Sequence, residues 1–230
     1  MNYAGQRSLA VTPERASDAI WVTYRWMSLG LATTGLVALL VAHTPALVEA
    51  LVTNRLVFYV LLFGQLGLVF AFSSVAARVS TAAAALMFFT YAGLTGVTFS
   101  TLFLVYTAAS IGATFFVTAG AFAGLSVFGM ATRRDLSAIG RFGLFALIGI
   151  ILASLVNMFL HSTGLEWLIT VIGVVLFAGL TAYDTQKLKV LFQSGQTTAN
   201  LPLVGALMLY LDFINMFLFL LRIMGDRRRD

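Results

Sequence analysis

The sequence has no cysteine among its 230 residues and only two histidines. Without cysteine there are no disulfide bridges, no catalytic thiol, no Cys-ligated zinc and no iron–sulfur cluster. Two histidines are too few to supply the ligands of a His-based metal site. Charged residues are also scarce, at 10% of the chain, against about 25% in soluble domains. We therefore expect neither a resident metal or cofactor nor a water-soluble globule.

The chain is instead rich in apolar residues, which make up 60% of it and give a mean hydropathy of +0.96. A membrane helix needs roughly 20 mainly apolar residues. Seven segments fit this requirement: 24–42, 56–77, 82–105, 108–131, 140–160, 165–184 and 203–224. The sequence thus predicts an all-α membrane protein, with a polar N-terminal segment (1–20) and one compact domain of seven transmembrane helices (21–230). The polar start of the chain is unlike a cleavable signal peptide, so we expect the first span to be retained.

The basic residues predict an orientation, because cytoplasmic loops are enriched in Arg and Lys. With the N-terminus inside, most basic residues fall on the inner side: Arg7, Arg15, Arg25, Arg78, Arg133, Arg134, Arg141, Lys187 and Lys189. The arginines after the seventh span, at 222 and 227–229, fall outside. Either the tail tolerates this, or one apolar segment does not cross fully. The net charge of +5 indicates membrane anchoring and no nucleic-acid binding.

Small residues are frequent within the spans. Gly120 and Gly124 form a GxxxG pair, and 64/67 and 93/96 are further close glycine pairs. Such residues let membrane helices approach closely, so we interpret them as helix-packing positions. A glycine-lined ion path is the alternative interpretation.

Two of the nine acidic residues lie in or against an apolar span, where charge is costly and usually marks function. Asp212 lies within the seventh span, and Asp184 closes the sixth. Asn215 follows Asp212 by three residues and Thr181 precedes Asp184 by three, so each pair shares a helix face. These residues predict a polar seam. The alternative is a structural hydrogen-bond network that ties helices together.

The two aspartates would have distinctive chemistry if they met. Two carboxylates in a low-dielectric interior cannot both ionise cheaply, so the pair would hold one proton and titrate as a unit. Arg78, at the inner end of the second span, is a candidate cationic lock for the pair. Asp212 would lie roughly 14 Å deep, whereas Asp184 would lie near the surface. Contact therefore requires a deeper sixth helix or an inner cavity, either of which the polar segment 185–200 would permit.

The residues around both aspartates resemble the Bax inhibitor-1 (transmembrane Bax inhibitor motif) family of seven-helix membrane proteins, and its bacterial branch above all. Ala-Tyr-Asp-Thr-Gln-Lys at 182–187 is similar to its sixth-span motif, and Leu-Tyr-Leu-Asp-Phe-Ile-Asn-Met-Phe-Leu at 209–218 to its seventh-span motif. Leu-Gly-Leu-Val-Phe at 66–70 and Thr-Gly-Val-Thr at 95–98 add supporting similarity. The resemblance covers essentially the whole chain.

The resemblance implies a pH-sensitive calcium leak pathway in the bacterial inner membrane. Asp184 and Asp212 would be the proton-sharing pH sensor and would contact Ca²⁺ transiently as it permeates. Arg78 would lock the pair, although the chain has fewer basic residues there than is usual in bacterial members. Gln65 stands where an acidic residue would help to attract a cation.

A second function remains open at this stage, that of a non-conducting modulator that binds other membrane proteins. The resemblance suggests a membrane-bound AAA protease as such a partner, contacted through the N-terminal segment or the Arg-rich tail. Enzyme activity is not expected, because the spans hold no Ser–His pair and few metal ligands.

Overall fold

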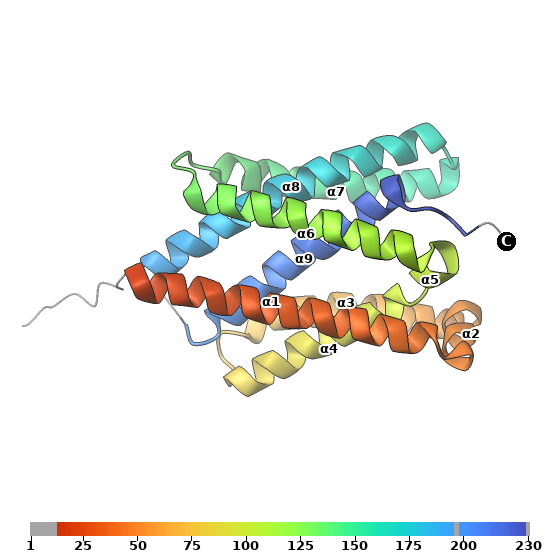
Figure 1. Ribbon diagram of the computed structural model, residues 1–230, viewed down its shortest axis with the longest axis horizontal. Helices are drawn as coiled ribbons and strands as arrows, with labels where there is room; N and C mark the ends of the chain where they lie inside the picture. The colour runs from red at the N-terminus through yellow and green to blue at the C-terminus, as the bar shows by residue number, and fades with distance from the viewer. Residues whose placement is uncertain (1–12, 196–197, 229–230) are drawn as a thin grey trace, which may run out of the picture.

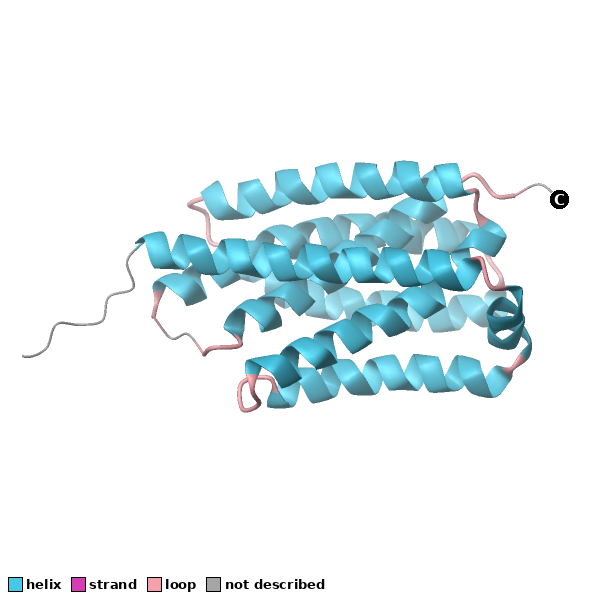
Figure 2. Cartoon of the chain, turned by 60° about the horizontal axis from the view of Figure 1, so that its bottom comes forward, coloured by secondary structure: helices cyan, strands magenta, loops and turns pink. Residues whose placement is uncertain are grey.

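The computed structural model describes residues 13–195 and 198–228, and the part described is almost entirely helical (Figures 1 and 2). Its helices are α1 (Pro13–Ala42), α2 (Pro45–Thr53), α3 (Arg55–Val75), α4 (Thr81–Phe99), α5 (Leu102–Val105), α6 (Ala108–Ala131), α7 (Ser137–Leu160), α8 (Thr163–Gln193) and α9 (Leu201–Met224). Within these residues, seven helical segments are long and apolar enough to cross a membrane. The predicted all-α, seven-helix membrane fold is confirmed.

Two segment boundaries in the structure differ from those predicted from the sequence. The first membrane helix begins at Pro13, so the second half of the predicted N-terminal segment 1–20 belongs to α1, and residues 1–12 lie outside the described part. The sixth span does not end at Asp184 but continues to Gln193. Hydropathy misses this extension because residues 184–189 are mostly polar, while helical hydrogen bonding continues regardless of polarity.

The turns between the long helices gather at two ends of the bundle (Figure 1). We call the end at which α1 begins the N-side and the end at which α9 finishes the C-side. The turns after α3, α6 and α8 lie on the N-side, and α2, α5 and the turn after α7 lie on the C-side. Because all seven long helices run between these ends, the chain leaves the bundle opposite the point where α1 begins.

Helix α9 lies at the centre of the bundle and packs against α1, α4, α6 and α8. In its most apolar stretch 56% of the residues are buried, against 6% in α3 and 11% in α7. Tyr210, Leu209 and Met216 of α9 are among the largest fully buried side chains. The hydrophobic faces of α3 and α7 are exposed, as expected of helices that face lipid.

Side chains cap several helix ends, where backbone groups lack intrahelical partners. The side chains of Asn54, Ser80, Thr107 and Ser162 accept hydrogen bonds from backbone N–H groups at the starts of α3, α4, α6 and α8. Before α7, hydrogen bonds from the Ser137 side chain and backbone lower the pKa of the Asp135 carboxyl.

A single buried asparagine joins the α3–α4 turn to the start of α9. Asn200 Nδ2 donates to the carbonyl oxygens of Ala76 (2.7 Å) and Val79 (2.8 Å). Its Oδ1 accepts from Thr81 Oγ1 at 2.8 Å. The predicted polar segment 185–200 therefore ends in a buried three-bond clamp, and 185–193 are helical.

At the C-side the chain after α9 is tied to the α5–α6 junction. Tyr106 and Arg227 form an isolated antiparallel bridge. Thr107 N donates to Asp226 O (3.1 Å), and Arg228 N donates to Val105 O (2.9 Å). This contact holds residues 225–228 against the bundle, while 229 and 230 lie outside the described residues.

The glycines that permit close helix contact are mostly not those that the sequence pattern singled out. A Cβ added at Gly120, Gly124, Gly64, Gly67 or Gly93 would meet nothing within 4 Å. Gly96 is the exception, because a Cβ there would lie 2.6 Å from the Thr34 carbonyl oxygen. The tightest approach between α6 and α8 is instead at Gly129, where a Cβ would overlap the backbone carbonyl of Ala182. The interpretation of the GxxxG pair as a helix-packing site is therefore wrong for this bundle. The residue spacing shows that the two glycines share one face of their helix, but it does not show whether another helix packs on that face.

We expect Gly129→Ala to destabilise the bundle by about 1–3 kcal/mol, since a backbone carbonyl cannot rotate away from the new methyl group. Gly124→Ala, on the same helix, is the matched control and should be neutral or slightly stabilising, because it has open space and gains helix propensity. Thermal unfolding in detergent measures both. Equal melting temperatures for the two variants would contradict the assignment of Gly129 as the contact.

We also expect Asn200→Ala to cost about 3 kcal/mol, because it leaves two carbonyl groups and one hydroxyl without their partner. Asn54→Ala removes an exposed cap of the same residue type and should cost about 1 kcal/mol. The unfolding midpoints in denaturant compare them. A smaller loss at 200 than at 54 would show that the clamp does not hold the turn.

Candidate functional site

Helices α8 and α9 run antiparallel and approach closely at two glycines. A Cβ at Gly173 of α8 would lie 2.6 Å from the Phe219 ring of α9, and a Cβ at Gly205 of α9 would lie 2.7 Å from the Leu188 side chain of α8. Between these contacts the antiparallel order places Asp184 opposite Asp212. Their carboxyl groups lie within hydrogen-bonding reach of each other. The structure therefore brings the two sequence-predicted aspartates together.

The extension of α8 explains how they meet. Asp184 lies nine residues before the end of α8, and Asp212 lies eleven residues after the start of α9. At 1.5 Å per residue these positions are about 14 Å and about 17 Å from the N-side ends of their helices. Both aspartates thus lie at a similar depth. The sequence predicted that contact requires a deeper sixth helix or an inner cavity, and the extension of α8 provides the deeper helix.

The environments of the two carboxyl groups differ. Asp212 is 5% exposed, and its Oδ2 has no hydrogen-bond partner among the described residues. Asp184 is only partly buried. Burying two unpaired negative charges side by side is costly in a low-dielectric interior. One proton held between the carboxyl groups removes the repulsion and supplies a hydrogen bond.

The basic residue beside the pair is Lys187, one turn further along α8, whose positive charge acts on Asp184. Its Nζ lies 5.8 Å from the centre of the Tyr183 ring. Arg78 is exposed on the α3–α4 turn, and it is absent from the groups that act on either aspartate. In this arrangement Arg78 does not lie against the pair, and the Asn200 clamp links its turn to the start of α9.

The two residues of the predicted polar seam bond within their own helices. Thr181 is fully buried and donates to the Phe177 carbonyl at 2.7 Å. Asn215 Nδ2 donates to the Leu211 carbonyl at 2.7 Å. Neither donates to an aspartate, but Asn215 lines a cavity of about 440 Å³ between α3, α4 and α9.

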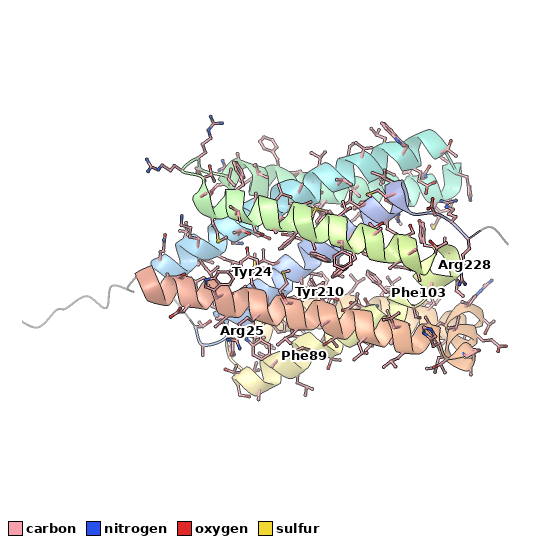
Figure 3. The ribbon with its side chains drawn as sticks, in the orientation of Figure 1. Tyr24, Arg25, Phe89, Phe103, Tyr210 and Arg228 are labelled. Carbon is pink, nitrogen blue, oxygen red and sulfur yellow. The ribbon has the colours of Figure 1, made fainter. Side chains whose placement is uncertain are left out.

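Sequence reasoning missed a second polar cluster near the centre of the bundle. The hydroxyls of Tyr210 and Thr34 are 2.6 Å apart, and Thr34 also donates to the Ala92 carbonyl at 2.9 Å. Figure 3 shows Tyr210 of α9 directed into the bundle behind α1. Nearby, Gln65 Nε2 of α3 donates to Thr98 Oγ1 of α4 at 2.8 Å. Tyr210 stands two residues before Asp212 in the same motif. Its place there is the sequence feature that could have predicted this cluster.

Among residues 13–195 and 198–228, no group of three or more His, Cys, Asp or Glu side chains could hold a metal ion. Asp184 and Asp212 are thus two carboxyl groups without a third protein ligand of these types. Such a pair suits a transient cation contact better than a resident site, since Ca²⁺ takes six to eight oxygen ligands.

Comparison with known proteins agrees with this architecture. Residues 17–229 match the family model described as inhibitor of apoptosis-promoting Bax1. The chain is 50% identical to inner membrane protein YbhL of Escherichia coli (strain K12), over 96% of this chain and 98% of that protein. It is 46% identical to an uncharacterised protein of Deinococcus radiodurans, over 96% and 97% of the two chains. An uncharacterised protein of Rickettsia prowazekii is 40% identical, over 89% and 88%.

The family match spans nearly the whole chain and includes both aspartate motifs, and the curated relatives match over almost their full length. The expected resemblance is thereby confirmed, with bacterial relatives. This multi-pass membrane protein belongs to the Bax inhibitor-1 family.

Proposed function

We propose that the protein is a pH-sensitive cation leak pathway, with Ca²⁺ as the permeant ion, gated by protonation of the Asp184–Asp212 pair. The observation that carries the proposal is the meeting of two carboxyl groups inside a seven-helix membrane bundle. Such groups are costly in a membrane and usually mark an ion or proton path.

The chemistry of the pair supplies the gate. When both carboxyl groups are ionised, they offer the hard oxygen ligands that Ca²⁺ prefers. When the pair holds its proton, the charge that attracts a cation is reduced and the two side chains bond to each other. Oδ2 of Asp212 is buried and has no hydrogen-bond partner among the described residues, so a cation would reach it only after the helices around the pair move apart.

Polar side chains extend from the pair towards the C-side. Asn215, one turn from Asp212, lines the 440 Å³ cavity together with Gln65 and Thr98. A second cavity of about 400 Å³, lined by Asn54 and Arg55, shares Thr101 with the first. In the arrangement seen here, the Gln65–Thr98 bond holds α3 against α4, so that movement of α3 would widen this route.

We propose Lys187 as a second candidate for the lock beside Arg78. The charge of Lys187 acts on Asp184, so we expect this residue to tune the pair in this arrangement. A lock by Arg78 would require the α3–α4 turn to move towards α9.

We expect Ca²⁺ flux into proteoliposomes to rise with pH, because ionisation of the pair attracts the cation. In Asp184→Asn and Asp212→Asn the ratio of alkaline to acid flux should fall, because the remaining carboxyl group loses the neighbouring negative charge that opposes its ionisation and titrates at a lower pH. Fluorescent Ca²⁺ indicator inside the vesicles measures the flux. Identical pH profiles in all three proteins would remove the sensor role.

Substitution of each basic residue in turn distinguishes between Lys187 and Arg78 as the residue that locks the pair. Lys187→Gln should move the flux profile to higher pH, because ionised Asp184 loses its neighbouring charge, whereas Arg78→Gln should leave it unchanged. A shift with Arg78→Gln alone would restore the Arg78 lock. Absence of flux at every pH in the wild type would instead favour the modulator function, with a membrane-bound AAA protease as candidate partner.

For location, we propose the bacterial inner membrane with the N-side in the cytoplasm. The relative from Escherichia coli is named an inner membrane protein. Arg78, Arg133 and Arg134 lie in N-side turns, and Lys187 and Lys189 lie near the N-side end of α8. This excess of basic residues favours the cytoplasmic side.

A reporter fused after Asp230 should be on the periplasmic side, with alkaline phosphatase active and green fluorescent protein dark. Fusion after Arg134, in the N-side turn between α6 and α7, is the matched control and should give the opposite pattern. The same pattern at both positions would contradict the antiparallel placement of these ends in the membrane.

A further inference from the structure

Two adjoining clefts lie between α1 and α6 and together form a groove. Figure 1 shows these two helices side by side, with α8 and α9 behind them. Both helices pack on α8 and α9. The N-side section is a cleft of about 500 Å³ bounded by residues 16–24 of α1 and 123–130 of α6. The C-side section, of about 590 Å³, is bounded by residues 27–39 and 108–122. The two linings follow one another directly along both helices.

The N-side cleft is apolar along its walls and polar at one end. Ile20, Trp21, Ala123, Val127 and Met130 form the apolar part. Lys189 and Gln193, near the end of α8, and Ser17, near the start of α1, are polar residues towards its N-side end. Trp21 is 66% exposed and stands where amphipathic rings meet the membrane interface.

Ser126 gives the cleft an unsatisfied hydrogen-bond donor. It lines the cleft and is only 3% exposed, and its Oγ has no hydrogen-bond partner among the described residues. A serine in a membrane helix ordinarily donates to a carbonyl of its own helix, as Thr118 of α6 does to Thr114 O at 2.8 Å. Ser126 lies five residues before the end of α6, about 7.5 Å below the N-side end. Because the Oγ is itself covered, an acceptor that enters the cleft to this depth would satisfy it once the Ser126 side chain rotates towards the cleft.

Lys189 supplies the charge. Its Nζ donates to the Met130 carbonyl at 2.7 Å, which fixes the ammonium group at the rim between α6 and α8. An ammonium has three donors, so two remain for an anion. Arg133 and Arg134 lie on the following turn, which Gln186 holds against α8 through the Arg134 carbonyl (2.8 Å) and Leu136 N (2.9 Å).

We propose that this cleft binds one anionic phospholipid of the N-side leaflet. The phosphate lies at Lys189, an ester carbonyl oxygen accepts a hydrogen bond from Ser126 Oγ, and an acyl chain follows the groove between α1 and α6. The C-side section suits the chain, because Phe213, Ile214 and Phe217 of α9 contribute to its lining. The order phosphate, ester and hydrocarbon matches the order lysine, serine and apolar wall. The proposal is independent of ion conduction.

Trp21 at the rim allows a direct test. In the full-length protein with Trp26→Phe and Trp167→Phe, Trp21 is the only remaining tryptophan of the three. Brominated phosphatidylglycerol and brominated phosphatidylcholine are compared as quenchers in mixed vesicles. We expect the anionic lipid to reach half-quenching at a mole fraction about fivefold lower, as one nearby basic residue provides. Equal quenching by the two lipids would overturn the proposal.

Variants distinguish lipid binding in the cleft from general attraction of anionic lipid to a basic surface. Lys189→Gln should abolish the preference, and Ala123→Phe, which fills the cleft from an exposed position, should reduce quenching by both lipids. Arg25→Gln is the matched control, since Figure 3 shows Arg25 on the side of α1 away from Tyr24 and the groove; it should change nothing. A preference that survives Lys189→Gln but is lost in Arg133→Gln/Arg134→Gln, or failure of either lipid to quench Trp21, would contradict the proposal.

Discussion

The antiparallel contact between α8 and α9 is the constraint on which the site depends. Glycines at 173 and 205 let the two backbones approach on either side of the aspartates, and this closeness is what brings Asp184 to Asp212. A larger residue at either glycine would displace the partly buried Phe219 or the buried Leu188 side chain. The depth of the pair follows from the same contact, because α8 has to continue to Gln193 for the two positions to align. Packing and electrostatics are therefore coupled at one interface.

Because α9 is central, its polar groups are shielded from water, and several of them meet partners in other helices. Tyr210 meets Thr34 of α1, Asp212 meets Asp184 of α8, and Asn200 holds the turn after α3. These contacts connect α9 with three different parts of the bundle. A change in the protonation of Asp212 would thus act on a helix that touches most of the others, which is a reasonable place for a sensor.

The bundle presents two different kinds of opening. The cavity between α3, α4 and α9 has Gln65, Thr98 and Asn215 in its lining and adjoins the helix that carries Asp212. The groove between α1 and α6 is mostly apolar, with the charged residue of its lining, Lys189, at the N-side end. The first opening has a larger share of polar side chains in its lining than the second, and the two lie on different faces of the bundle. The proposed ion pathway and the proposed lipid site are therefore lined mainly by different helices.

The sequence by itself determined the class of protein and the two acidic positions. Long apolar runs allow only a membrane helix, and a scarcity of charge makes each buried acid conspicuous. It could not determine contacts between helices, because membrane spans are apolar on nearly all faces and their periodicity is weak. Only the tertiary structure decided that Gly129 and not Gly120 touches a neighbour, that the charge of Lys187 and not of Arg78 acts on Asp184, and that Asn200 clamps a turn. Those outcomes depend on helix rotation and depth, which packing sets once the bundle has assembled.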